Sequence, residues 1–187
     1  LAQVMGQIKI LASALFKISN DIKILSSGPR SGIYELIIPQ NEPGSSIMPG
    51  KVNPTQCEAL SMVCTQVMGF EYAVSIANAS GTLQMNEYKP LIGFNILTSI
   101  KLLNNAISNF RLKLVEGIQP NTKTIKKNLE NSLMLVTALV PKIGYEKAAE
   151  IANLAFNESI NLKEATIKLG YLTAKDFEDA INTNKMI

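Results

Sequence analysis

Apolar residues recur along the first 25 positions of the chain at alternating spacings of three and four. This spacing places them on one face of an α-helix, as in the seam of a coiled coil. Residues 26–29 read Ser-Ser-Gly-Pro, and glycine and proline commonly end helices. The sequence therefore predicts a long helix over residues 1–25 whose seam consists of Leu1, Val4, Ile8, Leu11, Leu15, Ile18, Ile22 and Leu25.

A short strand, a loop and a second long helix are predicted next. Residues 35–39 read ELIIP, which is short, β-branched and bounded by turn residues, and residues 40–53 are rich in Gly, Ser, Pro and Asn. The second helix is predicted from Asn53 to about Asn78, with Asn53 as the N-cap, Pro54 in the first position and Gln56 completing a capping box. Its apolar stripe is Leu60, Val63, Val67, Phe70, Val74 and Ala77.

A third helix is predicted over residues 88–116, with apolar residues again at helical spacing. Three helices of roughly 35–45 Å, at about 1.5 Å per residue, form a rod rather than a compact ball. Their apolar stripes therefore require further helices, from other residues or from other subunits. The third stripe is Ile96, Ile100, Leu103, Ile107, Phe110 and Leu114.

The apolar repeats become shorter after a linker predicted at residues 117–120. Pro141, Gly144 and Gly170 separate predicted helices at 122–138, 145–158, 162–169 and 174–182, and Asn161 and Thr173 occupy N-cap positions. The predicted fold class is therefore all-α, a long-helix bundle segment followed by a small helical carboxy-terminal domain. We place the bundle domain at residues 1–118, with a substrate loop at 41–53, and the small domain at 119–187.

Composition places the chain among globular proteins, because 47% of its residues are hydrophobic and 18% are charged. No run of 18 or more apolar residues lacks a charge, so we expect no transmembrane helix and no membrane partner. The sequence shows no cleavable leader, its first methionine is Met5, and Leu1 already lies inside an amphipathic pattern. We therefore expect the chain to be part of a longer protein.

The charge pattern does not favour nucleic-acid binding. The formal net charge is only +3, and the densest basic group, Lys123, Lys126 and Lys127, is typical of a solvated helix face. Aromatic residues make up 6% of the chain and tryptophan is absent, which leaves few surfaces for base stacking.

Histidine is absent from the sequence, and this restricts the chemistry that the chain can perform. A general acid or base must be Ser, Lys, Tyr, Asp or Glu, or a histidine supplied by other residues. Cys57 and Cys64 lie seven apart in a helical pattern, and two thiols without histidine cannot complete a zinc site. We expect core packing for both, no metal site, and a reducing compartment such as the bacterial cytosol or the mitochondrial matrix.

The loop at residues 44–54 gathers groups that suit a small carboxylate. Glycine permits close approach of a ligand, Ser45 and Ser46 offer adjacent hydroxyls, Lys51 offers a positive charge and Asn53 an amide. The helix that follows presents unpaired N–H groups at the same place, which favours a ligand that gains negative charge. An ordinary connection between helices has the same composition, however, and Asn53 would then serve as the cap.

The order of residues in this loop resembles one family in particular. The run GSSIMPGKVNP at 44–54 is similar to the pattern GSSxMPxKxNP of the fumarase/aspartase superfamily, and the following TQCE at 55–58 resembles its fumarase branch. The resemblance extends along the chain, through Asn20-Asp21-Ile22, Ser27-Gly28-Pro29-Arg30, Asn41-Glu42-Pro43, residues 132–139 and Ile143-Gly144-Tyr145.

This resemblance implies a class II fumarase, which hydrates fumarate reversibly to L-malate without a cofactor. It implies that Ser45 is the catalytic base that removes a proton from C3 of malate, with Ser46 as the alternative. Lys51 and Asn53 match residues that contact a substrate carboxylate, and we expect Ser46 to bind substrate with them. Glu58 matches the acid that orients a histidine from another subunit, although a glutamate in a first helical turn also suits the helix dipole.

The resemblance also implies a homotetramer in which three subunits build each active site. The other two segments of that site lie amino-terminal to the residues of this chain, so we expect the chain alone to be inactive. Two alternatives remain. An aspartase or another fumarate-releasing lyase would share Ser45, Lys51 and Asn53. A helical-bundle interaction module would keep the fold without the chemistry, which the absence of histidine allows.

Overall fold

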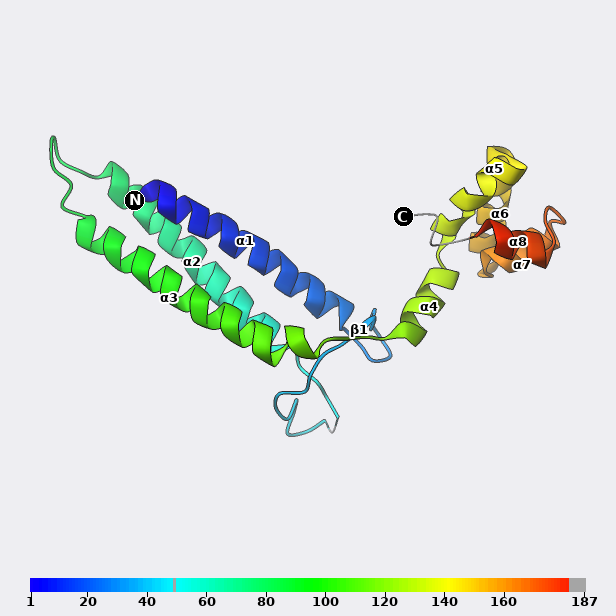
Figure 1. The fold of residues 1–187 in the computed structure, drawn as a ribbon, viewed down its shortest axis with the longest axis horizontal. Coiled ribbons are helices and arrows are strands. Elements are labelled where there is room, and N and C mark those ends of the chain that lie inside the picture. The colour runs from blue at the N-terminus through cyan, green and yellow to red at the C-terminus, as the bar shows by residue number, and fades with distance from the viewer. Residues whose placement is uncertain (49, 182–187) are drawn as a thin grey trace. The chain divides into compact units, whose positions relative to one another are not determined.

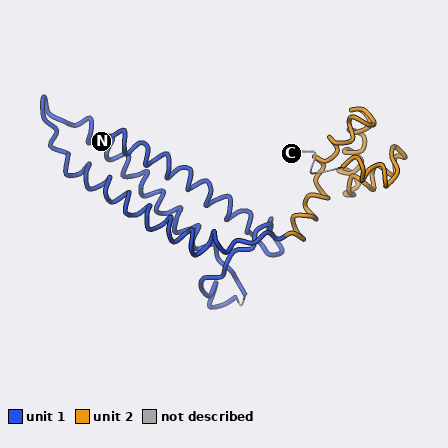
Figure 2. The backbone as a smooth tube through the Cα atoms, viewed as in Figure 1, with its two compact units in different colours: residues 1–121 blue, residues 122–187 orange. Residues whose placement is uncertain are grey.

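The computed structural model describes residues 1–48 and 50–181. Pro49, in the predicted substrate loop, and residues 182–187, in the predicted small domain, lie outside the described residues. The chain divides into two compact units, residues 1–121 and 122–187 (Figure 2). Helices dominate both units, and the strands of the described residues form a single two-stranded pairing, so the all-α prediction is confirmed.

Unit 1 consists of three long helices laid side by side (Figure 1). These are α1 (Ala2–Leu25), α2 (Thr55–Ala79) and α3 (Lys89–Lys113). Helix α2 packs against both of the others, whereas α1 and α3 contact each other only slightly. The three helices therefore share one core along α2 and leave broad faces exposed within this chain.

The face that α1 buries differs from the predicted seam. Its fully buried residues are Met5, Ala12 and Ser19, whereas half of the predicted seam, including Leu11 and Ile18, is exposed. The side of α1 that faces the core combines these buried residues with Ile8, Leu15 and Ile22 of the predicted seam, which are partly buried. The predicted helix is confirmed, but the seam is wrong in part because apolar spacing alone does not decide which residues face α2.

Helix α2 supplies the largest share of the buried core of unit 1. Its buried residues are Cys57, Leu60, Cys64, Val67, Val74 and Ala77, and the core is completed from α3 by Ile92, Ile96, Leu103, Phe110 and the following Leu114. By length and composition alone α2 is also long and apolar enough to cross a membrane. The core helix of a soluble domain meets the same criterion, and α2 packs between two helices, so this observation is weak evidence for a membrane.

A small strand pairing closes one end of unit 1. Strand β1 (Leu36–Ile37), which the sequence predicted within 35–39, pairs antiparallel with β2 (Gln119–Pro120), in the segment predicted as a linker. A 3₁₀ turn, η1 (Val115–Gly117), joins α3 to β2. The pairing fixes the start of the loop that runs from β1 to α2.

Unit 2 consists of short helices, and those after residue 132 enclose a separate core. They are α4 (Thr122–Glu130), the 3₁₀ helix η2 (Leu133–Leu139), α5 (Val140–Ile143), α6 (Tyr145–Glu158), α7 (Leu162–Lys168) and α8 (Ala174–Ala180). The single helix predicted over 122–138 is therefore wrong, because the chain turns at residues 131–132 and continues as a 3₁₀ helix. The core of unit 2 consists of Leu139, Ile151, Ala155, Leu162, Ala165 and Phe177.

Two predicted helix caps in unit 2 are confirmed. The Asn161 side-chain oxygen accepts from the backbone N–H of Glu164 at 2.9 Å, and the Thr173 hydroxyl accepts from that of Asp176 at 3.2 Å. Each bond satisfies an N–H group that the first turn of a helix leaves unpaired.

Candidate functional site

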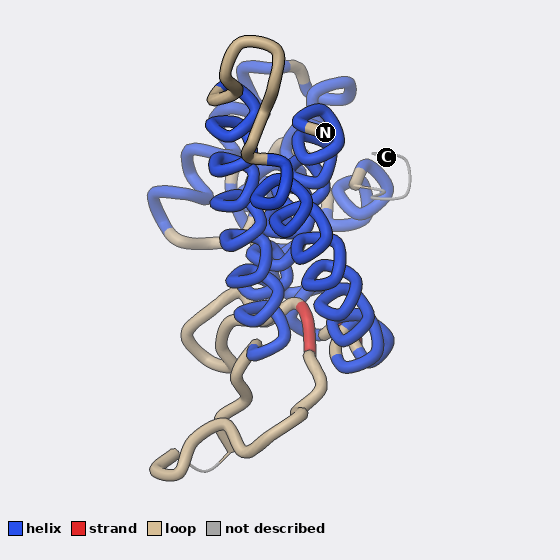
Figure 3. Tube along the Cα trace, turned by 90° about the vertical axis from the view of Figure 1, so that its left-hand side faces the viewer, coloured by secondary structure: helices blue, strands red, loops and turns tan. Residues whose placement is uncertain are grey.

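The loop between β1 and α2 carries the predicted site and protrudes from one end of the three-helix unit (Figure 3). The Asn41 amide donates to the carbonyl of Lys113 at 2.9 Å, in the last turn of α3. This bond satisfies a carbonyl that the end of a helix leaves unpaired. Together with the β1–β2 pairing, it ties the first part of the loop to the third helix.

The base of the loop is closed by Asn53, which does not act as a helix cap. Helix α2 begins at Thr55 with Pro54 as N-cap and no side-chain cap bond, so the predicted Asn53 cap and its Gln56 capping box are wrong. The Asn53 amide instead donates to the carbonyl of Gly44 at 2.5 Å. The Asn53 amide nitrogen is therefore occupied within the loop, while its side-chain oxygen accepts no hydrogen bond from the described residues.

Gly44 allows the backbone of the loop to approach closely at positions 44 and 51. A Cβ atom at position 44 would overlap the backbone carbonyl of Lys51, which no small side-chain movement can relieve. The loop base thus needs glycine for its close approach.

Replacing Gly44 with alanine should therefore open the loop base. We expect trypsin to cleave after Lys51 about tenfold faster in Gly44→Ala, because local opening governs such cleavage. Mass spectrometry of the early digest measures this rate. Gly93→Ala is the control, since a Cβ at position 93 on α3 meets no atom within 4 Å. Equal cleavage rates in the two variants would contradict the need for glycine at this close approach.

The two serines of the loop have different surroundings. The Ser45 hydroxyl oxygen accepts from the backbone N–H groups of Ile47 at 3.1 Å and Met48 at 3.2 Å, and Ser45 is half-buried. Ser46 is exposed and has no such donors among the described residues. Hydrogen bonds to the charged form of a group favour that form. The geometry therefore supports an ionised hydroxyl at Ser45 better than at Ser46.

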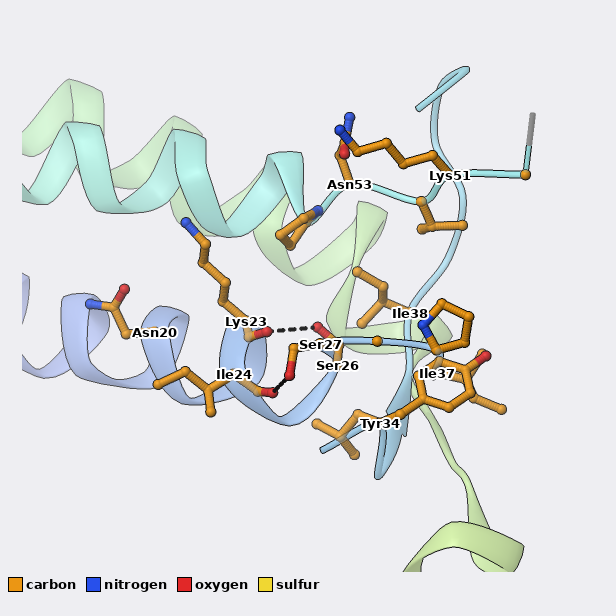
Figure 4. Close-up of a pocket in the computed structure, with 16 residues that line it drawn as sticks. Asn20, Lys23, Ile24, Ser26, Ser27, Tyr34, Ile37, Ile38, Lys51 and Asn53 are labelled. Atoms are coloured by element: carbon orange, nitrogen blue, oxygen red, sulfur yellow. Dashed lines mark hydrogen bonds between the residues drawn. The ribbon is translucent and has the colours of Figure 1, made fainter. Parts of the chain in front are cut away.

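A cavity of about 890 Å³ lies between the end of α1 and the loop (Figure 4). Lys51 and Asn53 line it from the loop, and Asn20, Lys23 and Ser27 line it from α1 and the turn that follows. Lys51 is exposed and forms no ion pair with any of the described residues. Its positive charge is thus available to an anion in the cavity.

Glu58 lies in the first turn of α2, where it is half-buried. Its Oε1 atom is 3.6 Å from the ammonium nitrogen of Lys23 on α1. Ser45, Ser46 and Glu58 do not line the cavity, whereas Lys51 and Asn53 do. Of the five predicted site residues, the structure of this chain therefore brings only Lys51 and Asn53 to the cavity.

Both cysteines are buried, as their helical spacing predicted. Cys57 and Cys64 are free thiols, and burial in the apolar core raises the pKa of each above its ordinary value. A raised pKa keeps a thiol protonated and poorly reactive. Among residues 1–48 and 50–181, no three His, Cys, Asp or Glu side chains form a group that could hold a metal.

Sequence reasoning missed the contribution of α1 to the site. Asn20 and Lys23 line the cavity, and Lys23 also contacts Glu58, yet neither belongs to the loop motif. The resemblance at Asn20-Asp21-Ile22 marked this segment without indicating a role. Only the packing of α1 along α2 brings Asn20 and Lys23 to the loop.

Comparisons with known proteins agree with this arrangement. The family described as Lyase matches residues 1–69, and the family described as Fumarase C C-terminus matches residues 135–187. The fumarate hydratase class II of Prochlorococcus marinus subsp. pastoris is 97% identical over the whole chain, which spans 41% of that relative. The crystal structure of the class II fumarase from Schistosoma mansoni superposes with a TM-score of 0.90 at 44% identity, covering 97% of this chain and 38% of that one.

A second solved structure, the fumarate lyase:delta crystallin from Brucella melitensis, superposes with a TM-score of 0.94 at 42% identity. It covers 99% of this chain, which spans 40% of that protein. The three-helix unit and its loop thus place the chain in the fumarase/aspartase superfamily. Within it, the chain belongs to the class II fumarase family.

Proposed function

We propose that this chain supplies the serine base and a carboxylate-binding lysine of a fumarate hydratase, which interconverts fumarate and L-malate. The observation that carries the proposal is the Ser45 hydroxyl, whose oxygen accepts two backbone N–H groups. A free serine hydroxyl is far too weak an acid to act as a base near neutral pH, so its alkoxide needs such donors.

In the direction from malate, the Ser45 alkoxide takes a proton from C3. The electron pair left on C3 moves into the adjacent carboxylate, which then carries two negative charges. Lys51 and the N–H groups at the start of α2 are suited to stabilise this charge, and Asn53 adds a polar contact. The hydroxyl on C2 then receives a proton from an acid and leaves as water, while the electron pair returns from the carboxylate to form the C2–C3 double bond of fumarate.

This chain has no histidine, so we propose that the acid is a histidine of another subunit, oriented by Glu58. The exposed apolar side chains of unit 1 support assembly with further helices, since isolated domains rarely expose so many. We propose a homotetramer. These side chains include Val4, Leu11 and Ile18 on α1, Met62 and Ile76 on α2, and Phe94 and Leu97 on α3.

We propose further that residues 1–118 belong to the helical-bundle domain of the lyase and residues 119–187 to its small carboxy-terminal domain. The division of the chain into units at residues 121 and 122 supports a boundary in this region. The two buried free thiols support a reducing compartment, for which we propose the cytoplasm.

The test uses a full-length chimera, the Prochlorococcus marinus relative carrying this chain in place of the matching 41% of its length. Fumarate loss is followed by ultraviolet absorbance in plain buffer and in buffer with ammonium. We expect loss in plain buffer with malate as the product.

Loss that requires ammonium would assign an aspartase activity instead. No loss in either buffer, from a chimera that still assembles, would contradict the proposal and favour a non-catalytic module. The chain alone is the matched control and is expected to leave fumarate unchanged, because it lacks histidine.

A further inference from the structure

We propose that Lys23 is a positioning residue for Glu58, which its ammonium group holds in one orientation on the first turn of α2. The inference rests on the proposed function, in which Glu58 orients the acid of the reaction. Figure 4 shows the Lys23 side chain rising from α1 toward the start of α2, and its nitrogen is 3.6 Å from Glu58 Oε1.

The backbones that carry the two side chains are fixed to each other. One turn before Lys23, the buried Ser19 hydroxyl donates to the carbonyl of Cys57 at 2.6 Å, and Cys57 directly precedes Glu58. The Ser61 hydroxyl donates to the Glu58 carbonyl at 2.8 Å. The Ser19 bond therefore sets the register of α1 against α2 at this point, while the Glu58 side chain can still rotate.

The ion pair restricts that rotation while leaving the carboxylate usable. Lys23 contacts Oε1, so Oε2 remains an acceptor for an N–H group brought by another subunit. A carboxylate held at one oxygen presents the other in a defined direction. This arrangement suits a group that orients an acid, because misplacement of a catalytic group by even 1 Å is costly.

Folding alone does not explain the pair. The side chains of Lys23 and Glu58 are 48% and 45% exposed, and ion pairs in such positions contribute little to stability. A second ion pair between the same two helices, Lys9 with Glu71 at 2.9 Å, lies far along them from the loop. It provides a comparison for a purely structural role, with a lysine of similar exposure and a carboxylate, Glu71, that is only 16% exposed.

The experiment measures kcat and KM for fumarate in the full-length chimera with Lys23→Met, Lys23→Arg and Lys9→Met. We expect Lys23→Met to lower kcat by about 10-fold to 100-fold, part of the about 10²–10⁴-fold that a positioned acid or base supplies, with KM changed less than about twofold. Lys23→Arg should restore most of the turnover, and Lys9→Met should resemble the parent.

A double-mutant cycle then separates positioning from other effects. If Lys23 acts through Glu58, Lys23→Met should have almost no further effect on kcat in a Glu58→Gln background. Urea unfolding of Lys23→Met should give a midpoint at least as high as that of Lys9→Met, because Lys9→Met leaves the less exposed Glu71 carboxylate without its lysine.

Full turnover in Lys23→Met, additive losses in the cycle, or equal losses in Lys23→Met and Lys9→Met would each overturn the role of Lys23 while leaving the proposed function intact. An inactive but assembled parent chimera would overturn both, since the positioning role presupposes the reaction.

Discussion

Replacing Ser45 with alanine is expected to lower kcat of the full-length chimera by about 10²–10⁴-fold, the range that a positioned general base supplies. The hydroxyl oxygen accepts two backbone N–H groups, and its removal leaves no other atom on that side chain to take the C3 proton. The two N–H groups freed by the change lie in an exposed part of the loop, where water can satisfy them. The variant should therefore fold and assemble.

Steady-state kinetics with malate measure this effect, and native mass determination checks the assembly. Ser46→Ala is the matched control, because Ser46 is the neighbouring hydroxyl, is exposed and accepts no such donors among the described residues. We expect it to keep kcat within about tenfold of the parent. The reverse result, a severe loss in Ser46→Ala with near-normal turnover in Ser45→Ala, would move the base to Ser46.

Replacing Lys51 with methionine should lower kcat/KM by about 10²–10³-fold, because removing one group that stabilises developing charge typically costs this much. Lys51 lines the cavity, is exposed and has no ion-pair partner among the described residues, so its charge is free for a substrate carboxylate. Methionine keeps the length of the side chain and removes the charge.

The Lys51 prediction differs from the Ser45 prediction in its effect on binding. Calorimetry with succinate, a dicarboxylate that cannot react, should show weaker binding to Lys51→Met and unchanged binding to Ser45→Ala. Lys127→Met is the control, since Lys127 is an exposed lysine on α4 in the other unit. Unchanged kcat/KM and succinate affinity in Lys51→Met would remove Lys51 from the site.

The secondary structure was largely predictable because it depends on local periodicity. Three long apolar repeats, ended by glycine, proline and serine, gave helices close to α1, α2 and α3. The caps at Asn161 and Thr173 were also predictable, since a side chain and an N–H three residues away are local partners. The helix predicted over 122–138 failed, because its apolar residues fit a 3₁₀ helix as well as an α-helix.

The roles of individual polar side chains were less predictable. Asn53 stands where an N-cap is expected, yet its amide crosses the loop to Gly44, nine residues earlier. The difference between Ser45 and Ser46 is equally invisible in sequence, because two adjacent hydroxyls have the same composition around them. It arises from the turn of the backbone, which directs two N–H groups at the first serine.

The sequence by itself determined the all-α class, the loop that carries the site and, through the order of residues at 44–58, the family. The tertiary structure decided which face of α1 is buried and which residues of α1 reach the loop. Lys23 meets Glu58 because Ser19 fixes the register between two helices whose contacts lie far apart in the chain. Periodicity specifies that a helix has an apolar face, but packing against α2 decides which residues that face includes, since Ala12 is buried and Leu11 is exposed.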